Sequence, residues 1–216
     1  MDFALRLASI LSFLFCVISL TVQILRTFSY GRVRRYSQAK GAPESGVRYA
    51  FSKGLMPWEK ESASRHPAAY LAGTAYHGGV FAGLSYLACV VARFELPEAL
   101  LLLLRVFLVL GLLGGTALFL RRVFVPSLRS LSCPDDFASN LIVGAFVFLS
   151  LLRTYLPSAE TALLASSIMM FLYAPVGKIR HCFFFFYARV LLGRFFGRRG
   201  VLPPLNARHP GGPRDA

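Results

Sequence analysis

Long apolar stretches alternate with short basic segments along the chain. Five of the apolar stretches run for about 20 residues, the length that an α-helix needs to cross ~30 Å of hydrocarbon. This pattern predicts an all-α integral membrane protein, a five-transmembrane-helix bundle in a single membrane domain over residues 1–216. The first stretch lacks an A-x-A cleavage site, so we expect a retained span rather than a removed signal peptide. The predicted spans are residues 3–25, 70–92, 97–120, 137–156 and 161–188.

The basic residues indicate how these helices are oriented. Lysine and arginine number 24 against 10 acidic residues, and 20 of the 24 lie in the segments 26–65, 121–129 and 178–214. Basic loops stay in the cytoplasm, which places the N-terminus outside and both the loop 26–66 and the tail 189–216 inside. The same rule accounts for the formal charge of +14 without a nucleic-acid partner, for which the chain has no recognisable binding module.

Composition narrows the class of protein further. Hydrophobic residues make up 56% of the chain and charged residues 16%, well below the quarter typical of soluble domains, which excludes an ordinary soluble domain. The four cysteines have no CxxC spacing, so the sequence contains neither a disulfide framework nor a cysteine-ligated iron–sulfur cluster. Any such cluster belongs to another chain.

Two histidines, His77 and His181, lie inside predicted spans, where a coordinating group indicates function. His77 is seven residues into the second span and His181 is eight residues before Arg189, where the fifth span returns to the cytoplasm. At 1.5 Å per residue both depths are similar, ~10 and ~12 Å. Imidazoles at matched depth on separate helices suit a haem with one histidine on each side of the iron. Such a haem transfers electrons because no axial position is left for substrate. The alternative is a pair of polar residues satisfied within the bundle.

Small residues gather around the first of these histidines. They would leave room for a flat ring against the helix, although small residues also let bare helices pack closely. They are Gly73, Gly78, Gly79 and Gly83.

Lys178 and Arg180 flank the second histidine near the predicted cytoplasmic interface. Haem propionates would favour cationic partners there, and the alternative is that both side chains extend to the interface as positive-inside residues. Pro175 and Gly177 precede them and predict a kink in the fifth span, tolerated where neighbours satisfy the freed carbonyl.

Three segments of the chain resemble a known family. They are Tyr76–Gly83, Phe119–Pro126 followed by Arg129, and Pro175–His181. In this order they resemble the gamma chain of respiratory nitrate reductase, its cytochrome b subunit, and the related b-type subunits of heterodisulfide reductase-type complexes. The similarity covers roughly residues 70–189 and extends to the five spans and the outside N-terminus.

The resemblance implies a function. Members of this family are quinol-oxidising anchors in the inner (cytoplasmic) membrane of bacterial or archaeal cells, and they pass electrons through haem b to a cytoplasmic iron–sulfur oxidoreductase. Carried over by motif, His77 and His181 are the axial pair of one bis-His haem b, with quinone and membrane lipid as further partners. The family's second ligand pair falls on Leu87 and Leu163, which cannot bind iron. A single inner haem implies a quinone site in the inner half of the membrane and little charge separation.

Several polar residues remain outside this scheme. His66 precedes Pro67 and is expected at the entry to the second span, with the proline in its first turn. The segment 56–62 is expected at the membrane interface. Arg105 is expected to face the bundle, and Arg153 to extend outward.

Two other functions fit parts of the pattern. A cofactor-free membrane scaffold or small transporter would use the histidines for packing or proton relay. An intramembrane hydrolase would need a nucleophile motif, which neither Ser85 nor Ser150 has.

Overall fold

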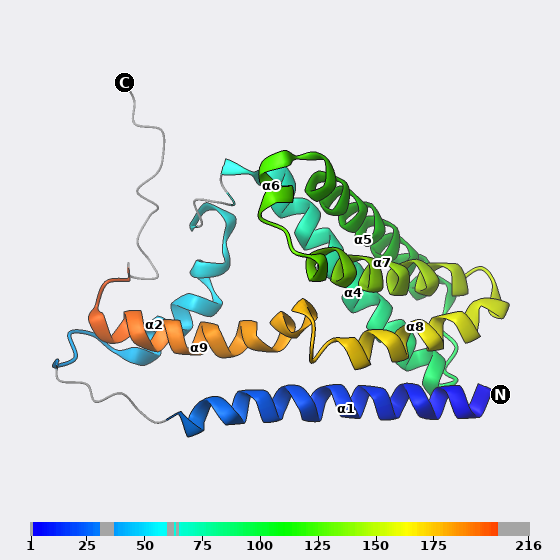
Figure 1. Ribbon diagram of the computed structural model, residues 1–216, viewed down its shortest axis with the longest axis horizontal. Helices are drawn as coiled ribbons and strands as arrows, with labels where there is room; N and C mark the ends of the chain where they lie inside the picture. The colour runs from blue at the N-terminus through cyan, green and yellow to red at the C-terminus, as the bar shows by residue number, and fades with distance from the viewer. Residues whose placement is uncertain (1, 31–36, 60–62, 64, 203–216) are drawn as a thin grey trace. The chain divides into compact units, whose positions relative to one another are not determined.

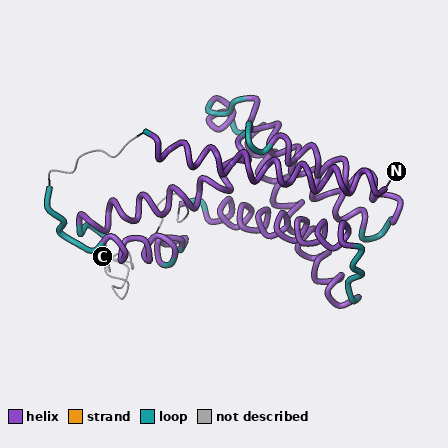
Figure 2. Tube along the Cα trace, turned by 90° about the horizontal axis from the view of Figure 1, so that it is seen from below, coloured by secondary structure: helices purple, strands orange, loops and turns teal. Residues whose placement is uncertain are grey.

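A computed structural model describes residues 2–30, 37–59, 63 and 65–202 (Figure 1). Within these ranges the chain is helical almost throughout, with short connections and no strand (Figure 2). The helices are α1 (Asp2–Ser29), α2 (Pro43–Phe51), α4 (Pro67–Ala92), α5 (Glu98–Phe124), α6 (Pro126–Ser130), α7 (Pro134–Arg153), α8 (Glu160–Tyr173) and α9 (His181–Arg199). Single 3-10 turns lie at Lys53–Leu55, Pro57–Glu59, Pro157–Ala159 and Lys178–Arg180.

Four of the described helices, α1, α4, α5 and α7, are long and apolar enough to cross a membrane, and α8 with α9 makes up to five if that bent pair is one span. The predicted all-helical class, with several helices suited to a membrane, is therefore confirmed. The number of spans and their orientation stay predictions.

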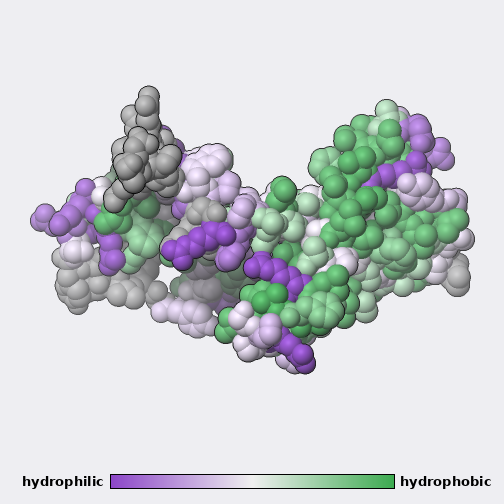
Figure 3. Space-filling model, turned by 90° about the horizontal axis from the view of Figure 1, so that it is seen from above, coloured by the Kyte–Doolittle hydropathy of each residue, from purple (hydrophilic) through white to green (hydrophobic). Residues whose placement is uncertain are grey.

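The surface of these helices is consistent with lipid as the solvent. They expose large apolar side chains, as Leu102 and Leu113 of α5 do at 60% and 63%. On the face in Figure 3 the hydrophobic surface is broad and the hydrophilic residues gather in small groups. A soluble monomer rarely exposes so large an apolar area.

The predicted fifth span differs from the structure. Instead of one kinked helix over 161–188, α8 ends at Tyr173 and α9 begins at His181. Pro175 has no N–H to continue the helix, and the N–H groups of Val176 and Gly177 both donate to the Tyr173 carbonyl. A Cβ on Gly177 would overlap the Tyr173 ring, so a larger residue there would require that ring to move.

The chain divides into two compact units, and the prediction of a single membrane domain stays a prediction. The bundle unit comprises Met1–Thr21 and Ala68–Arg180, and the second, which we call the α2–α9 unit, comprises Val22–Pro67 and His181–Ala216. The predicted loop 26–66 contains a helix, α2, and the predicted tail 189–216 begins as helix, because α9 continues to Arg199. The rest of the tail from residue 203 lies outside the described residues.

Glycines allow close packing in the bundle unit. A Cβ on Gly79 of α4 would lie 2.6 Å from the Gly111 Cα of α5, and one on Gly83 would lie 3.0 Å from the Phe146 ring of α7. Phe146 itself is fully buried. Helices in lipid associate through such close contacts because no hydrophobic effect drives them together. α7 in turn contacts both α5 and α8.

The α2–α9 unit is built on a second close crossing. A Cβ on Gly46 of α2 would overlap the Gly193 carbonyl oxygen and lie 2.6 Å from the Gly197 Cα, both on α9. The Arg189 guanidinium of α9 donates to the carbonyls of Ala50, at 3.0 Å, and Gly54, at 3.2 Å. Carbonyls at a helix C-terminus lack partners within the helix, so this arginine stabilises the end of α2.

Candidate functional site

The His77 ring is hydrogen-bonded to the backbone of its own helix, α4. Its side chain is exposed, and Nδ1 lies 2.7 Å from the Gly73 carbonyl oxygen one turn earlier. Since a carbonyl oxygen only accepts hydrogen bonds, Nδ1 is the donor. Metal-binding histidines are commonly oriented by this kind of bond from their other ring nitrogen. The bond at Nδ1 therefore resembles the one that orients a coordinating histidine.

His181 is the first residue of α9, directly after the turn Lys178–Arg180, and its side chain is exposed. It belongs to the α2–α9 unit, whereas His77 belongs to the bundle unit. The structure thus describes each histidine within its own unit, and their joint coordination of one iron stays a prediction.

The space beside His77 is only partly formed by the predicted glycines. Gly79 and Gly83 pack against other helices, so they do not serve as a surface for a ring. Gly73, one turn from His77 on the same face, would carry a Cβ with no atom within 4 Å, and Gly78 would meet only Phe107, at 3.5 Å. The open side of α4 next to His77 is therefore the side of Gly73.

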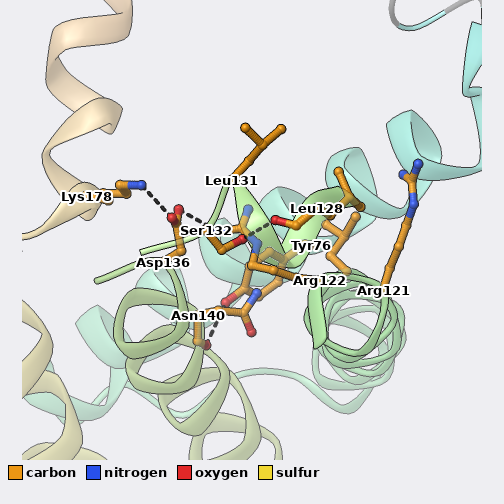
Figure 4. A pocket seen from close by; sticks show the side chains of 10 residues that line it. Tyr76, Arg121, Arg122, Leu128, Leu131, Ser132, Asp136, Asn140 and Lys178 are labelled. Carbon is orange, nitrogen blue, oxygen red and sulfur yellow. Dashed lines mark hydrogen bonds and ion pairs between the residues drawn. The ribbon is translucent and has the colours of Figure 1, made fainter. Parts of the chain in front are cut away.

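Lys178 binds a carboxylate that the sequence did not identify. Its Nζ donates to Asp136 Oδ2 at 2.6 Å, and Arg122 Nη1 lies 2.5 Å from Asp136 Oδ1 (Figure 4). The Cys133 backbone N–H also donates to Asp136, at 2.9 Å. The only feature of the sequence that could have indicated this carboxylate is an acidic pair, Asp135 and Asp136, at the start of an apolar stretch. Arg180 is exposed, and the propionate-binding roles of Lys178 and Arg180 stay predictions.

The two leucines at the family's second ligand positions are core residues. Leu87 of α4 is 5% exposed and Leu163 of α8 is 0% exposed. Neither side chain offers an atom that binds iron. These positions serve the packing of the bundle unit.

The other polar residues that the sequence analysis singled out lie at helix ends and connections or contact them. His66 is exposed and lies immediately before α4, which begins at Pro67, as predicted. Arg105 donates to the Thr154 carbonyl at 2.7 Å and pairs with Glu98 at 3.1 Å. It therefore joins α5 to the end of α7. The 3-10 turn Pro57–Glu59 lies in the predicted interfacial segment, of which residues 60–62 are outside the described residues.

A second polar cluster, which the sequence did not reveal, joins three helices. Glu160, the first residue of α8, binds both Arg6 of α1 and Arg153 of α7, the latter at 2.9 Å. The side chain of Arg153 is 23% exposed and is held by this carboxylate, and its extension towards the outer membrane surface stays a prediction. Charged side chains within membrane helices are usually paired in this way.

Among the described residues no group of three or more His, Cys, Asp or Glu side chains gathers to hold a metal ion. A haem differs from such a site because its ring supplies four of the iron ligands and the protein supplies the axial ones. No family model, curated protein or solved structure matches this chain. The fold and the site define the class only as an all-helical protein with four, or up to five, helices suited to a membrane.

Proposed function

We propose that this chain is a membrane subunit that holds one haem b and transfers electrons between the quinone pool and a cytoplasmic iron–sulfur oxidoreductase. It would resemble the gamma chain of nitrate reductase and the b-type subunits of heterodisulfide reductase-type complexes. The observation that carries the proposal is the hydrogen bond from His77 Nδ1 to the Gly73 carbonyl at 2.7 Å. That bond orients the ring, which is how coordinating histidines are prepared.

His77 and His181 would be the axial ligands, with Lys178 and Arg180 near the propionates. Haem b supplies a one-electron centre when it is bound. The part of the protein is to hold and orient both imidazoles, and to keep apolar helices around the site. Burial of Leu87 and Leu163 supports one haem rather than two. We therefore place the quinone site in the inner half of the membrane.

The orientation belongs to the same proposal. Five spans, counting α8 and α9 as one, would put the N-terminus outside and, of the α2–α9 unit, α2 and the C-terminal end of α9 on the cytoplasmic side. That unit carries basic side chains on α9, among them Arg194, Arg198 and Arg199. A basic cytoplasmic surface suits an acidic surface on the partner subunit.

The decisive experiment is a reduced-minus-oxidised spectrum of the purified chain with haem quantitation. We expect one haem per chain in the wild type, and loss of haem in both His77→Ala and His181→Ala. His66→Ala is the matched control, because this exposed histidine lies outside α4, and it should retain the haem. A colourless wild-type protein would contradict the proposal and support the cofactor-free scaffold or transporter.

A second experiment tests the open side of α4. Gly73→Leu fills the space next to His77 and should lower haem content severalfold while the helical circular dichroism is retained. Gly144→Leu is the control, since a Cβ on Gly144 also meets no atom within 4 Å and Gly144 lies on α7. Equal haem content in the two variants would show that the Gly73 side is not used.

A further inference from the structure

A pocket lies in the bundle unit where α4, the end of α5 and the start of α7 meet the turn Lys178–Arg180 (Figure 4). Its volume is about 460 Å³, within the range of sites for small ligands. Tyr76 forms part of the wall, and its hydroxyl donates to the Asn140 carbonyl at 3.2 Å. The pocket lining does not include His77 or His181, although Lys178, which we place near the haem propionates, does line it.

The pocket has an excess of positive charge. Arg121, Arg122 and Lys178 line it together with one carboxylate, Asp136. Asp136 binds both Arg122 and Lys178, whereas Arg121 forms no ion pair with any residue that the structure describes. Three cations against one anion leave two positive charges, which favour an anionic ligand.

The pocket also has an apolar side. Leu118, Leu128 and Leu131 line it, and Leu131 is 84% exposed. Arg121 and Arg122 lie in the last turn of α5, at the boundary between an apolar helix and a basic connection. A ligand that fits both sides has an anionic head and an apolar remainder, and it lies at the membrane surface.

We infer that this pocket binds the phosphate headgroup of an anionic phospholipid. Basic pockets between transmembrane helices on the cytoplasmic side are suited to such headgroups. Arg121 and Arg122 contact the phosphate, and the leucines contact the apolar part of the lipid. This site goes beyond the proposed electron transfer and does not depend on haem.

The test is native mass spectrometry of the full chain in detergent, titrated with phosphatidylglycerol or phosphatidylcholine. We expect phosphatidylglycerol to bind more tightly, and Arg121→Gln to weaken it about fivefold, the effect of one cation near a membrane surface. Arg129→Gln is the matched control, because it removes the same charge from the neighbouring α6 but does not line the pocket. It should change the affinity by less than about twofold, since screening weakens charges that do not contact the ligand.

A second variant tests the pocket without removing a cation. Ser132→Asp adds a negative charge to the lining and should lower phosphatidylglycerol binding at least as much as Arg121→Gln. Equal losses in Arg121→Gln and Arg129→Gln would overturn the inference in favour of general surface attraction. Complete displacement of the lipid by millimolar inorganic phosphate would overturn it in favour of a site for free anions.

Discussion

Gly79 of α4 and Gly111 of α5 meet backbone to backbone: a Cβ on Gly111 would lie 2.5 Å from the Gly79 Cα. No side chain lies between the two helices at this point, so their separation is set by the backbones themselves. Close approach of this kind increases the van der Waals contact between helices in lipid.

Gly79→Ala should destabilise the bundle unit by about 1–3 kcal/mol, the usual effect of overpacking. The helices must move apart because the added methyl meets backbone rather than a flexible side chain. Denaturant unfolding of the purified chain in detergent measures this. Gly144→Ala, with no atom within 4 Å of the added Cβ, should be neutral or slightly stabilising. Similar stability of the two variants would show that the crossing is looser.

Glu160→Gln should destabilise the protein by about 2 kcal/mol, the range for hydrogen bonds to charged groups. The change removes the charge that binds Arg6 and Arg153, whose side chains are 14% and 23% exposed. Thermal unfolding in detergent is a suitable measurement.

Glu98→Gln provides the comparison, because Glu98 pairs with Arg105 but its side chain is 79% exposed. Exposed ion pairs contribute little, so we expect a change below about 0.5 kcal/mol. If Glu98→Gln costs as much as Glu160→Gln, burial is not what makes the Glu160 cluster important.

The Tyr49 phenol should lose its proton at a higher pH than an ordinary tyrosine. Burial and the hydrogen bond to Glu59, whose Oε2 accepts from the phenol at 2.8 Å, raise the pKa of Tyr49 to about 12. The fold favours the neutral phenol, so its contribution to stability is fully present below the unfolded pKa of about 10 and is lost as the pH rises towards 12. Tyrosinate absorbance should show a late step that Tyr49→Phe removes. Glu59→Gln should move this step to lower pH but leave it above the pKa of an ordinary tyrosine, since burial is the larger cause.

Gly46→Ala should loosen α2 from α9. The added methyl would overlap the Gly193 carbonyl oxygen, which outweighs the gain in helix propensity. Hydrogen exchange of the α2 amides should become faster. Ser45→Ala on the exposed side of the same helix introduces the same residue and should leave exchange unchanged. Faster exchange in both variants would point to a cause other than the crossing.

Hydrophobic patterning predicts the long helices well because length and apolarity are properties of each segment alone. Their ends are less predictable: α7 begins at Pro134, where the Cys133 N–H donates to Asp136, and hydropathy does not register such a cap. The break after Tyr173 was visible as Pro175 and Gly177, but a kink and a full interruption have the same sequence signal.

The contacts of the candidate site likewise divide into local ones, which the sequence predicts, and long-range ones, which it does not. The bond between His77 and Gly73 joins residues one helical turn apart. A predicted helix over this segment therefore already brings the two residues close together. The bond between Lys178 and Asp136 joins residues 42 positions apart, and it depends on how α7 packs. Local periodicity carries no information about such a pair.

The crossing of α2 and α9 has a consequence for biosynthesis. Arg189 and Ala50 are 139 residues apart in the chain, and α4, α5, α7 and α8 are all made between them. Parts of a protein assemble as they emerge during synthesis, so α2 must wait for its partner until the ribosome has produced α9. A chain that ended before α9 would leave α2 without its packing partner and therefore open to proteases. Premature termination late in translation would thus expose a segment near the N-terminus to cleavage.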